Sequence, residues 1–237
     1  MPSEIVVTAP AKLTLSLRIT GVRPDGYHLI DAEMVSLDLC DVLTITEGDG
    51  LEVVAADGAP IPTGDDNLVR RAQLLAGFRA HIRLEKRIPP GAGLGGGSSD
   101  AAAVLRVAGF DDLQRAATIG ADVPFCLVGG RARVRGIGEI VEPLPPVERC
   151  FTLLIPPFGC STVEVYRQWD RMGGPSGEHG NDLEPAALAV EPRLAEWRDR
   201  LADATGQRPR LAGSGSTWFV EGAHTVERAV VVRTSVG

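Results

Sequence analysis

The stretch Ile88-Pro89-Pro90-Gly91-Ala92-Gly93-Leu94-Gly95-Gly96-Gly97-Ser98-Ser99-Asp100 carries the strongest local signal in this chain. Five of the seven residues from 91 to 97 are glycine, so the backbone there can adopt positive φ angles and approach a ligand closely. The serines lead into Asp100–Ala108, which is rich in helix formers and is predicted to be a helix. Free N–H groups before a helix N-terminus favour anions, so Pro89–Ser99 is predicted to bind phosphate. The alternatives are a linker and a helix-capping turn; a linker needs neither two prolines at one end nor a helix at the other.

Three common classes of phosphate-binding loop do not fit this stretch. Glycines 91, 93 and 96 have the spacing of a dinucleotide fingerprint, with Asp111 or Asp112 near the place of the ribose-binding acid. Only about ten residues separate the glycines from Asp111, too few for a helix and a second strand. The segment His81–Ile88 alternates apolar and charged residues, which predicts a half-exposed antiparallel strand rather than a buried parallel one. The sequence also lacks the lysine of a Walker loop and the His-Arg-Asp and Asp-Phe-Gly motifs of protein kinases.

The composition is that of an ordinary globular protein. At 237 residues, 44% of them hydrophobic and 23% charged, the chain can form one large domain or two small ones. A net charge of −7 argues against a nucleic-acid partner, because there is no basic field to release counterions. An anionic small-molecule substrate would need local positive charge, for which Lys12, Lys86 and Arg87 are candidates.

The cysteines and the N-terminus predict a cytoplasmic chain. Cys40, Cys126, Cys150 and Cys160 show no CxxC pairing and lie in apolar segments, so we expect buried, reduced thiols. The first residues have neither the basic nor the apolar region of a signal peptide. No apolar stretch reaches about 18 residues, so we expect no association with a membrane.

The residue patterns predict an α+β fold in two unequal halves. The predicted strands are Glu4–Thr8, Leu13–Ile19, Glu33–Leu39, Val42–Thr46, a weak one at Leu51–Ala55, His81–Ile88, a strand-turn-strand at Arg131–Val141, Cys150–Ile155 and Arg228–Arg233. Besides Asp100–Ala108, the predicted helices are Asn67–Ala80, one opened by Asp122, Thr162–Arg171, and a long one at Ala186–Ala204 that is bent or broken at Pro192. The proline-rich segment Pro143–Pro146 reads as a linker, which predicts domains at residues 1–145 and 146–237.

Six short motifs, in order along nearly the whole chain, resemble one superfamily. Together with the glycine loop, Pro10-Ala11-Lys12-Leu13-Thr14 and Leu211-Ala212-Gly213-Ser214-Gly215-Ser216 resemble the GHMP kinases. Asp25-Gly26-Tyr27-His28, Gly120–Phe125 and Asn181–Pro185 are similar to the branch of that superfamily that acts on a cytidine diphosphate-linked methylerythritol.

The resemblance implies a two-domain α+β GHMP-kinase fold with the active site in the cleft between the domains. The N-terminal domain would be ribosomal-protein-S5-domain-2-like and the smaller C-terminal domain ferredoxin-like, both trimmed. The implied reaction is ATP-dependent phosphorylation of the tertiary 2-hydroxyl of the methylerythritol unit, in the non-mevalonate route to isoprenoids, with Mg²⁺ bridging the phosphates. As partners it implies the small-molecule substrate, and no nucleic acid or membrane, for a monomer or weak homodimer.

The resemblance also implies roles for individual residues. Asp122 matches the catalytic base and Lys12 its charged partner, and Pro89–Ser99 matches the loop around the ATP phosphates. Asn67 and Lys86 match positions near the adenosine. The positions that match the substrate side are Thr14, Gly213 and Ser214, together with a cytidine pocket of Tyr27, His28, Thr162 and Tyr166 in which two aromatic rings sandwich the base.

Each of these residues also has a purely structural interpretation. Asp122 before Val-Pro is a good helix N-cap, and Lys12 alone would be a solvated lysine on a strand. Tyr27 and His28 after a turn would be surface residues or a satisfied core pair. Tyr166 on a helix would be a contact to the core.

The chain departs from the family pattern in several places. Thr14 stands where asparagine is usual, which shortens or replaces a hydrogen bond on the substrate side. The segments 48–66, 105–120 and 173–180 are short. Only Ala223–Val226 stands where a helix normally separates the last two strands, so a complete four-stranded second sheet is not assured by the sequence.

Two other functions compete with this kinase activity. Another GHMP kinase, for homoserine, mevalonate or a sugar, would share the glycine loop but has no need of two base-stacking tyrosines. A degenerate nucleotide-binding paralogue fits the trimmed chain and Thr14, but not the intact Lys12, Asp122 and glycine loop. Turnover of ATP with a panel of acceptor alcohols separates the three.

Overall fold

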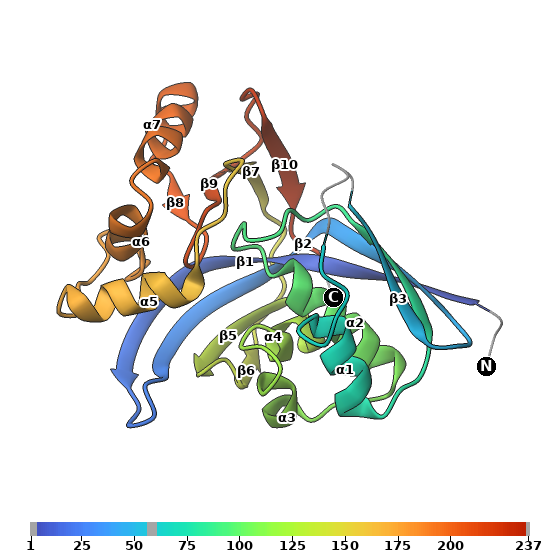
Figure 1. Cartoon of the computed structure of the whole chain (residues 1–237). Helices are drawn as coiled ribbons and strands as arrows, with labels where there is room; N and C mark the ends of the chain where they lie inside the picture. The colour runs from blue at the N-terminus through green and yellow to red at the C-terminus, as the bar shows by residue number, and fades with distance from the viewer. Residues whose placement is uncertain (1–3, 56–60, 236–237) are drawn as a thin grey trace.

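Two long antiparallel strands run across the whole molecule. The computed structural model describes residues 4–55 and 61–235, and in it β1 (Glu4–Val22) pairs with β2 (His28–Thr46) from end to end (Figure 1). The predicted turn between them is confirmed, because the Gly26 N–H donates to the Arg23 carbonyl at 2.9 Å and Gly26 has a φ of 87°.

The prediction of four short strands in this region was wrong, because β1 and β2 are each continuous. The pairing has three register shifts, between Pro10 and Lys12, between Thr14 and Ser16, and between Ile19 and Gly21. The first of them lets the ladder continue past the proline. A shift in register changes which face a side chain points to. Leu13 and Leu15 accordingly pack into one hydrophobic cluster, whereas Ala9 and Leu17 pack into another.

The first sheet has the order β3-β4-β2-β5-β6, with β1 on β2. Its further strands are β3 (Gly50–Ala55), β4 (His81–Lys86), β5 (Arg131–Gly136) and β6 (Ile140–Pro143). One side of β2 pairs with β1, and its other side is divided between β4, at residues 42–46, and β5, at residues 30–35. As predicted for this segment, β4 is antiparallel to β2, although it is also parallel to β3.

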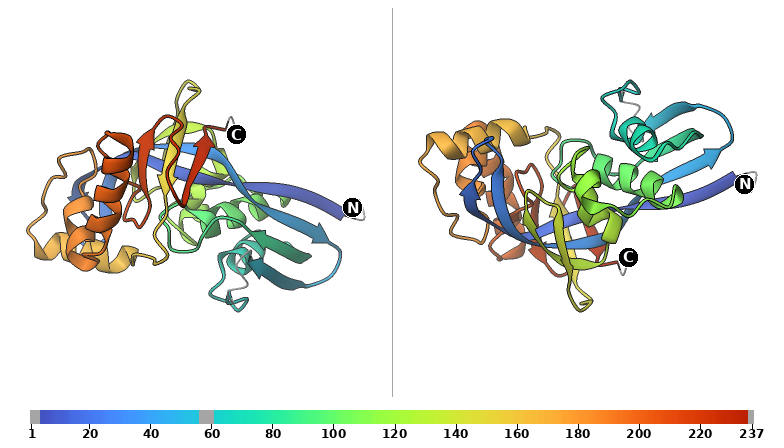
Figure 2. Two further views of the ribbon diagram at one scale, coloured as in Figure 1. Left: turned by 90° about the horizontal axis from the view of Figure 1, so that it is seen from above. Right: turned by 90° about the horizontal axis from the view of Figure 1, so that it is seen from below.

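Four helices belong with the first sheet and pack on one another. They are α1 (Leu68–Ala76), α2 (Gly96–Val107), α3 (Leu113–Ala117) and α4 (Val123–Val128), and α2 packs on β1 and β2 (Figure 2). Helix α2 begins four residues before the predicted start at Asp100, and α1 ends at Ala76 rather than Ala80. The early end of α1 follows from Gly77, whose φ of 61° is the left-handed conformation that closes helices.

The second sheet has the order β10-β7-β9-β8. It consists of β7 (Cys150–Leu154), β8 (Arg210–Leu211), β9 (Trp218–Glu221) and β10 (Ala229–Arg233), all antiparallel, so four strands form without a helix at residues 223–226. The helices that follow β7 along the chain are α5 (Thr162–Arg171), α6 (Glu184–Val190) and α7 (Leu194–Thr205). The long helix predicted at Ala186–Ala204 is two helices, because Pro192 lacks the N–H and crowds the preceding turn.

A hydrophobic cluster joins the two sheets. Leu13 of β1 and Leu37 of β2 pack with Phe151 of β7 and Phe219 of β9, whose rings meet edge to face at 5.8 Å. Leu37 also forms a bridge to Thr234, just beyond β10. The two sheets therefore share buried side chains and backbone contacts.

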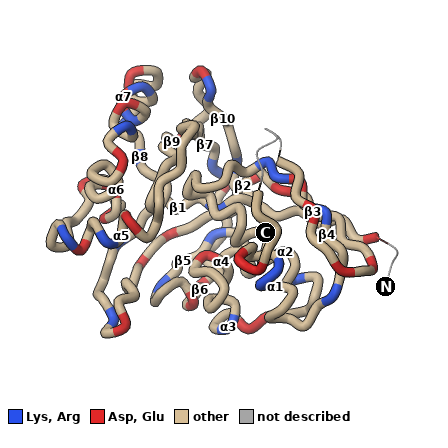
Figure 3. Tube along the Cα trace, in the orientation of Figure 1, with Lys and Arg blue, Asp and Glu red and all other residues tan. Residues whose placement is uncertain are grey.

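Acidic and basic residues are interspersed along the trace (Figure 3). All four cysteines are free thiols, but only Cys126 and Cys160 are buried, whereas Cys40 and Cys150 are half-buried. Within residues 4–55 and 61–235 no helix has the length and apolar character to cross a membrane.

Replacing Leu37 by alanine tests the joint between the sheets. The side chain is fully buried, so Leu37→Ala should lower the free energy of unfolding by about 2–5 kcal/mol, through lost burial and a cavity. Val231→Ala on β10, at a residue that is 46% exposed, is the control and should change it by less than about 0.5 kcal/mol. Urea unfolding followed by tryptophan fluorescence measures both, and equal effects would contradict a shared core.

Candidate active site

One cavity of about 770 Å³ collects nearly all the residues that the sequence singled out. Its wall is formed by the glycine loop, the middle of β1, the tip of the β1–β2 hairpin, one face of α5 and the turn before β9. All of the site residues proposed from the sequence line it except Ser99; they are Lys12, Thr14, Tyr27, His28, Asn67, Lys86, Pro89 through Ser98, Asp122, Thr162, Tyr166, Gly213 and Ser214.

The glycine loop is tightly shaped at three positions. Gly91, Gly93 and Gly95 have φ angles of 71°, 77° and 68°, which side chains other than glycine rarely adopt. A Cβ on Gly93 would lie 2.5 Å from the Ala212 carbonyl oxygen, so only glycine fits there. α2 begins directly after Gly95, and the first N–H groups of any helix have no acceptor within the helix. The loop can therefore present N–H donors to an anion in the cavity.

Neighbouring elements hold this loop in place. The Lys12 N–H donates to the Leu94 carbonyl at 2.9 Å, which joins the loop to β1. On the other side Thr217 donates to the Ala92 carbonyl through its N–H at 3.2 Å and its hydroxyl at 2.7 Å. The loop is thus attached to β1 of the first sheet and to the residue directly before β9 of the second.

Lys12 and Asp122 form an ion pair in the cavity wall. The Lys12 Nζ lies 3.2 Å from the Asp122 Oδ2 and 3.1 Å from the Thr14 hydroxyl, to which it donates. Lys12 is 5% exposed, whereas the Asp122 side chain is 32% exposed and accessible from the cavity. Asp122 occupies the N-cap position of α4, but its side chain makes no capping hydrogen bond. Its carboxylate faces Lys12, which argues against the interpretation of Asp122 as a helix cap.

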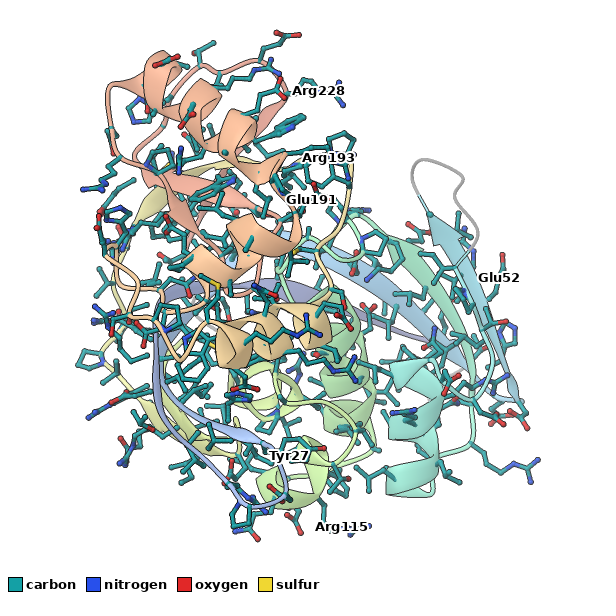
Figure 4. The ribbon with its side chains drawn as sticks, turned by 60° about the vertical axis from the view of Figure 1, so that its left-hand side comes forward. Tyr27, Glu52, Arg115, Glu191, Arg193 and Arg228 are labelled. Carbon is teal, nitrogen blue, oxygen red and sulfur yellow. The ribbon has the colours of Figure 1, made fainter. Side chains whose placement is uncertain are left out.

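Aromatic rings gather at the far end of the cavity. The ring of His28 lies 4.7 Å from that of Tyr166 and 5.5 Å from that of Trp169, and its Nε2 is 2.8 Å from the Asp170 Oδ1. Burial raises the pKa of the Tyr166 hydroxyl, since this side chain also packs on the core. Tyr27, at the tip of the hairpin, is 59% exposed (Figure 4).

The turn before β9 closes the wall beside Lys12. The hydroxyls of Thr162 and Ser214 are 2.9 Å apart, and a Cβ on Gly213 would lie 3.6 Å from the Lys12 Nζ. Asn181 stabilises this turn, because its Nδ2 donates to the Leu211 carbonyl at 3.0 Å and to the Gly213 carbonyl at 2.7 Å.

Three proposed nucleotide contacts have partners within the protein. The Asn67 Oδ1 accepts from the Val69 N–H at 2.9 Å and caps α1. Lys86 pairs with buried carboxylates, and the Ser99 hydroxyl donates to the Pro10 carbonyl at 2.6 Å. Ser99 thus contributes to the loop's anchoring, and its side chain does not face the cavity.

A metal ion here would depend on the nucleotide for most of its ligands. The described residues include no group of three or more His, Cys, Asp or Glu side chains that could hold one. The accessible Asp122 carboxylate is an oxygen donor of the kind that Mg²⁺ accepts alongside phosphate oxygens and water.

Comparison with known proteins identifies the family. Residues 66–130 match the model of the GHMP kinases N terminal domain. The chain is 41% identical over 239 residues to 4-diphosphocytidyl-2-C-methyl-D-erythritol kinase of Paracoccus denitrificans, covering 92% of this chain and 87% of that protein. The kinase of the same name from Pelotomaculum thermopropionicum is 39% identical over 254 residues, covering 91% and 88%. The chain belongs to the 4-diphosphocytidyl-2-C-methyl-D-erythritol kinase family.

Solved structures agree with membership of this kinase family. A crystal structure titled 4-(cytidine 5'-diphospho)-2C-methyl-D-erythritol kinase superposes with a TM-score of 0.77 at 31% identity, covering 98% of this chain and all of the other. A homoserine kinase from Cytophaga hutchinsonii superposes with a TM-score of 0.63 at 18% identity, which shows the shared fold alone. The resemblance to GHMP kinases and the α+β fold that it implied are confirmed.

Sequence reasoning missed two residues of the site in this family member. Asp170 lines the cavity, and it follows Thr162 and Tyr166 on α5 at intervals of four residues, which places all three on one helix face. That spacing was a usable signal. Asn181 lay inside a quoted motif, but its support of the Gly213 turn joins positions 32 residues apart and has no local signature.

Substitution of Gly93 tests how closely the loop must pack. Gly93→Ala would place a Cβ against backbone oxygens of Ala212 and Gly215, so we expect a large loss of nucleotide affinity as well as of stability. Gly109→Ala is the matched control, because Gly109 has a similar φ of 69° but open space around its Cα. The control should lose about 1–2 kcal/mol of stability and no affinity. Thermal melts and titration with an ATP analogue measure the two effects.

Proposed function

We propose that this chain transfers the γ-phosphoryl group of ATP to the tertiary 2-hydroxyl of 4-diphosphocytidyl-2-C-methyl-D-erythritol, in the non-mevalonate route to isoprenoids. The observation that carries the proposal is the Lys12–Asp122 pair at 3.2 Å, in the wall of the cavity that the glycine loop also lines. The names of the relatives support the choice of substrate.

The nucleotide end of the cavity suits a triphosphate. Phosphoryl transfer depends mainly on positioning and on neutralising charge at the migrating group. The loop amides and the N-terminus of α2 supply donors and a positive dipole. Lys12 adds a fixed positive charge, and its side chain runs past Gly95, where a Cβ would lie 2.6 Å from the Lys12 Cγ. Asn67 and Lys86 would lie near the adenosine. Bound Mg²⁺ would neutralise charge on the phosphates.

The base for the reaction would be Asp122. A carboxylate within hydrogen-bond reach of the attacking hydroxyl can accept its proton as the new P–O bond forms. Asp122 is accessible from the cavity and is held by Lys12 rather than by the N–H groups of α4. Lys12 can also interact with the phosphoryl group in transit, because its side chain runs past Gly95 of the loop and its Nζ lies beside the Asp122 carboxylate.

The acceptor end of the cavity suits a nucleobase. Tyr27 and Tyr166 are proposed to sandwich the cytosine, and His28, Thr162, Thr14, Gly213 and Ser214 to surround the rest of the molecule. Aromatic faces favour stacking on any base, and the polar groups of His28 and Asp170 lie next to them. Another GHMP kinase would not need this arrangement.

The proposal also covers the localisation, the oligomeric state and the domain bounds. The chain would act in the cytoplasm as a monomer or weak homodimer, with domains at residues 1–145 and 146–237 on either side of the cavity. The first sheet ends at Pro143 and the second begins at Cys150, which supports that boundary.

Turnover with a panel of acceptors tests the proposal as a whole. With ATP and Mg²⁺, we expect phosphorylation of the cytidylyl alcohol and no comparable rate with homoserine, mevalonate or galactose. Preference for one of those three would move the assignment to another GHMP kinase. Binding of ATP without turnover of any acceptor would favour a nucleotide-binding paralogue.

Replacing Asp122 by asparagine tests the base. Asp122→Asn keeps the shape of the side chain but cannot accept the proton, so kcat should fall by roughly 10²–10⁴-fold at unchanged nucleotide affinity. Asp112→Asn is the matched control, because Asp112 caps α3 through a 3.0 Å bond from the Arg115 N–H and asparagine caps equally well. Full activity in the Asp122 variant would remove this residue from the mechanism.

Replacing Tyr27 by alanine tests the stacking. Because this residue is largely exposed, Tyr27→Ala should leave the fold intact. A stacked base contributes about 1–3 kcal/mol, so KM for the cytidylyl substrate should rise about tenfold while KM for ATP stays constant. Tyr166→Ala should raise the same KM and also lower the melting temperature, because that ring packs on the core. Unchanged KM values in both variants would show that the base binds elsewhere.

A further inference from the structure

Three charged side chains meet beneath the glycine loop, apart from the Lys12–Asp122 pair. They are Asp41 of β2, Lys86 at the end of β4 and Asp100 of α2, and they are 0%, 8% and 2% exposed. The Lys86 Nζ lies 2.7 Å from the Asp100 Oδ2 and also pairs with the Asp41 Oδ2. We refer to them as the Asp41–Lys86–Asp100 cluster.

The cluster ties the two ends of the loop together. The Asp41 Oδ1 accepts hydrogen bonds from the N–H groups of Arg87, at 2.5 Å, and Ile88, at 2.8 Å, the two residues before the loop. Asp100 is the residue that directly follows the loop. Since Lys86 contacts both carboxylates, a single ammonium group joins the end of β4 to the start of α2.

The ammonium group also lies against the loop itself. A Cβ on Gly96 would be 3.0 Å from the Lys86 Nζ, so the backbone of α2 passes directly over it. Both Lys86 and Asp100 line the cavity. The cluster therefore packs against the backbone whose N–H groups would face the phosphates.

The buried charges of the cluster lower the stability of the fold relative to uncharged side chains at the same positions. Two carboxylates share one ammonium, and among the described residues the Asp100 Oδ1 has no hydrogen-bond partner. Incompletely paired buried charges are costly, and an amide or an apolar side chain would avoid that cost. Burial raises the pKa of Asp100 to about 7, with Lys86 acting against the rise and Asp41 adding to it. A role in nucleotide binding explains why such a group lies here.

We propose that Asp100 and Lys86 are positioning residues for the nucleotide: their ion pair, anchored by Asp41, fixes both ends of the glycine loop so that its N–H groups are already oriented toward the phosphates. This inference rests on the proposed use of ATP. Donors that are ordered beforehand bind an anion more tightly than donors that must be ordered on binding. Lys86, proposed above to lie near the adenosine, then also acts on the nucleotide by holding the loop.

The test is calorimetric titration with a non-hydrolysable ATP analogue, which needs no acceptor. Asp100→Ala removes the ion pair, and we expect Kd to rise about tenfold or more because the loop is no longer held in its binding geometry. Asp100→Asn keeps an oxygen that can accept a hydrogen bond from Lys86 but loses the charge. Its Kd should therefore lie between the Kd of the unmodified protein and that of Asp100→Ala. Asp203→Asn, at an exposed aspartate of α7, is the control for loss of one negative charge.

Two outcomes would overturn the inference, in different ways. If both Asp100 variants match the unmodified protein in Kd, the cluster does not position the nucleotide, and the proposed kinase activity stands. If the unmodified chain binds no analogue, the inference and the proposed use of ATP both fail. Should Asp100→Ala not fold, the Kd of Asp100→Asn decides: a Kd raised severalfold supports the inference, and an unchanged Kd overturns it.

Discussion

The continuous pairing of β1 with β2 is the constraint on which the candidate active site depends. Each strand is 19 residues long, and the pair carries Lys12 and Thr14 near its middle and Tyr27 at its tip. The bulges within β1 redirect successive side chains, so that one strand serves two hydrophobic clusters and the cavity wall. Positions separated along the cavity are therefore set by one hydrogen-bonded ladder rather than by independent loops.

This scaffold makes a buried lysine tolerable. Lys12 is nearly inaccessible to water, and a buried ammonium needs partners of opposite charge. Asp122 and the Thr14 hydroxyl supply two, and the cavity is open to the phosphates that would supply more. The Asp41–Lys86–Asp100 cluster is a second buried lysine site, in which one ammonium group pairs with two carboxylates. Both lysines line the cavity, and Lys86 also lies against the backbone at the start of α2.

Much of the local structure could be predicted from the sequence, because it depends on local chemistry. The glycine spacing located the loop, the alternation of His81–Ile88 identified an antiparallel strand, and Pro192 marked a helix break. What could not be predicted depends on distant partners. The predicted strands Glu4–Thr8 and Leu13–Ile19 are one strand, because β2 continues opposite them and a register shift between Pro10 and Lys12 keeps the pairing.

The same limit applies to the candidate site. On local grounds the sequence favours Asp122 as a helix cap, and the contact with Lys12, over a hundred positions away in the chain, argues for the other interpretation. Asp41 lies between two predicted strands as an isolated acid, and its partner Lys86 is 45 residues further on. Motif resemblance bridged the first of these gaps but not the second, because Asp41 belongs to none of the quoted motifs.

The residues at the tip and in the middle of the β1–β2 hairpin differ in how far they contribute to the stability of the fold. Tyr27 lies outside both hydrophobic clusters, whereas Lys12 is buried between elements of both sheets. Changes at the tip therefore carry little penalty in folding, and changes around Lys12 carry a large one. With the roles proposed for these residues, substitutions at the tip can alter acceptor binding at little cost in stability, whereas substitutions around Lys12 cannot alter phosphate binding so cheaply.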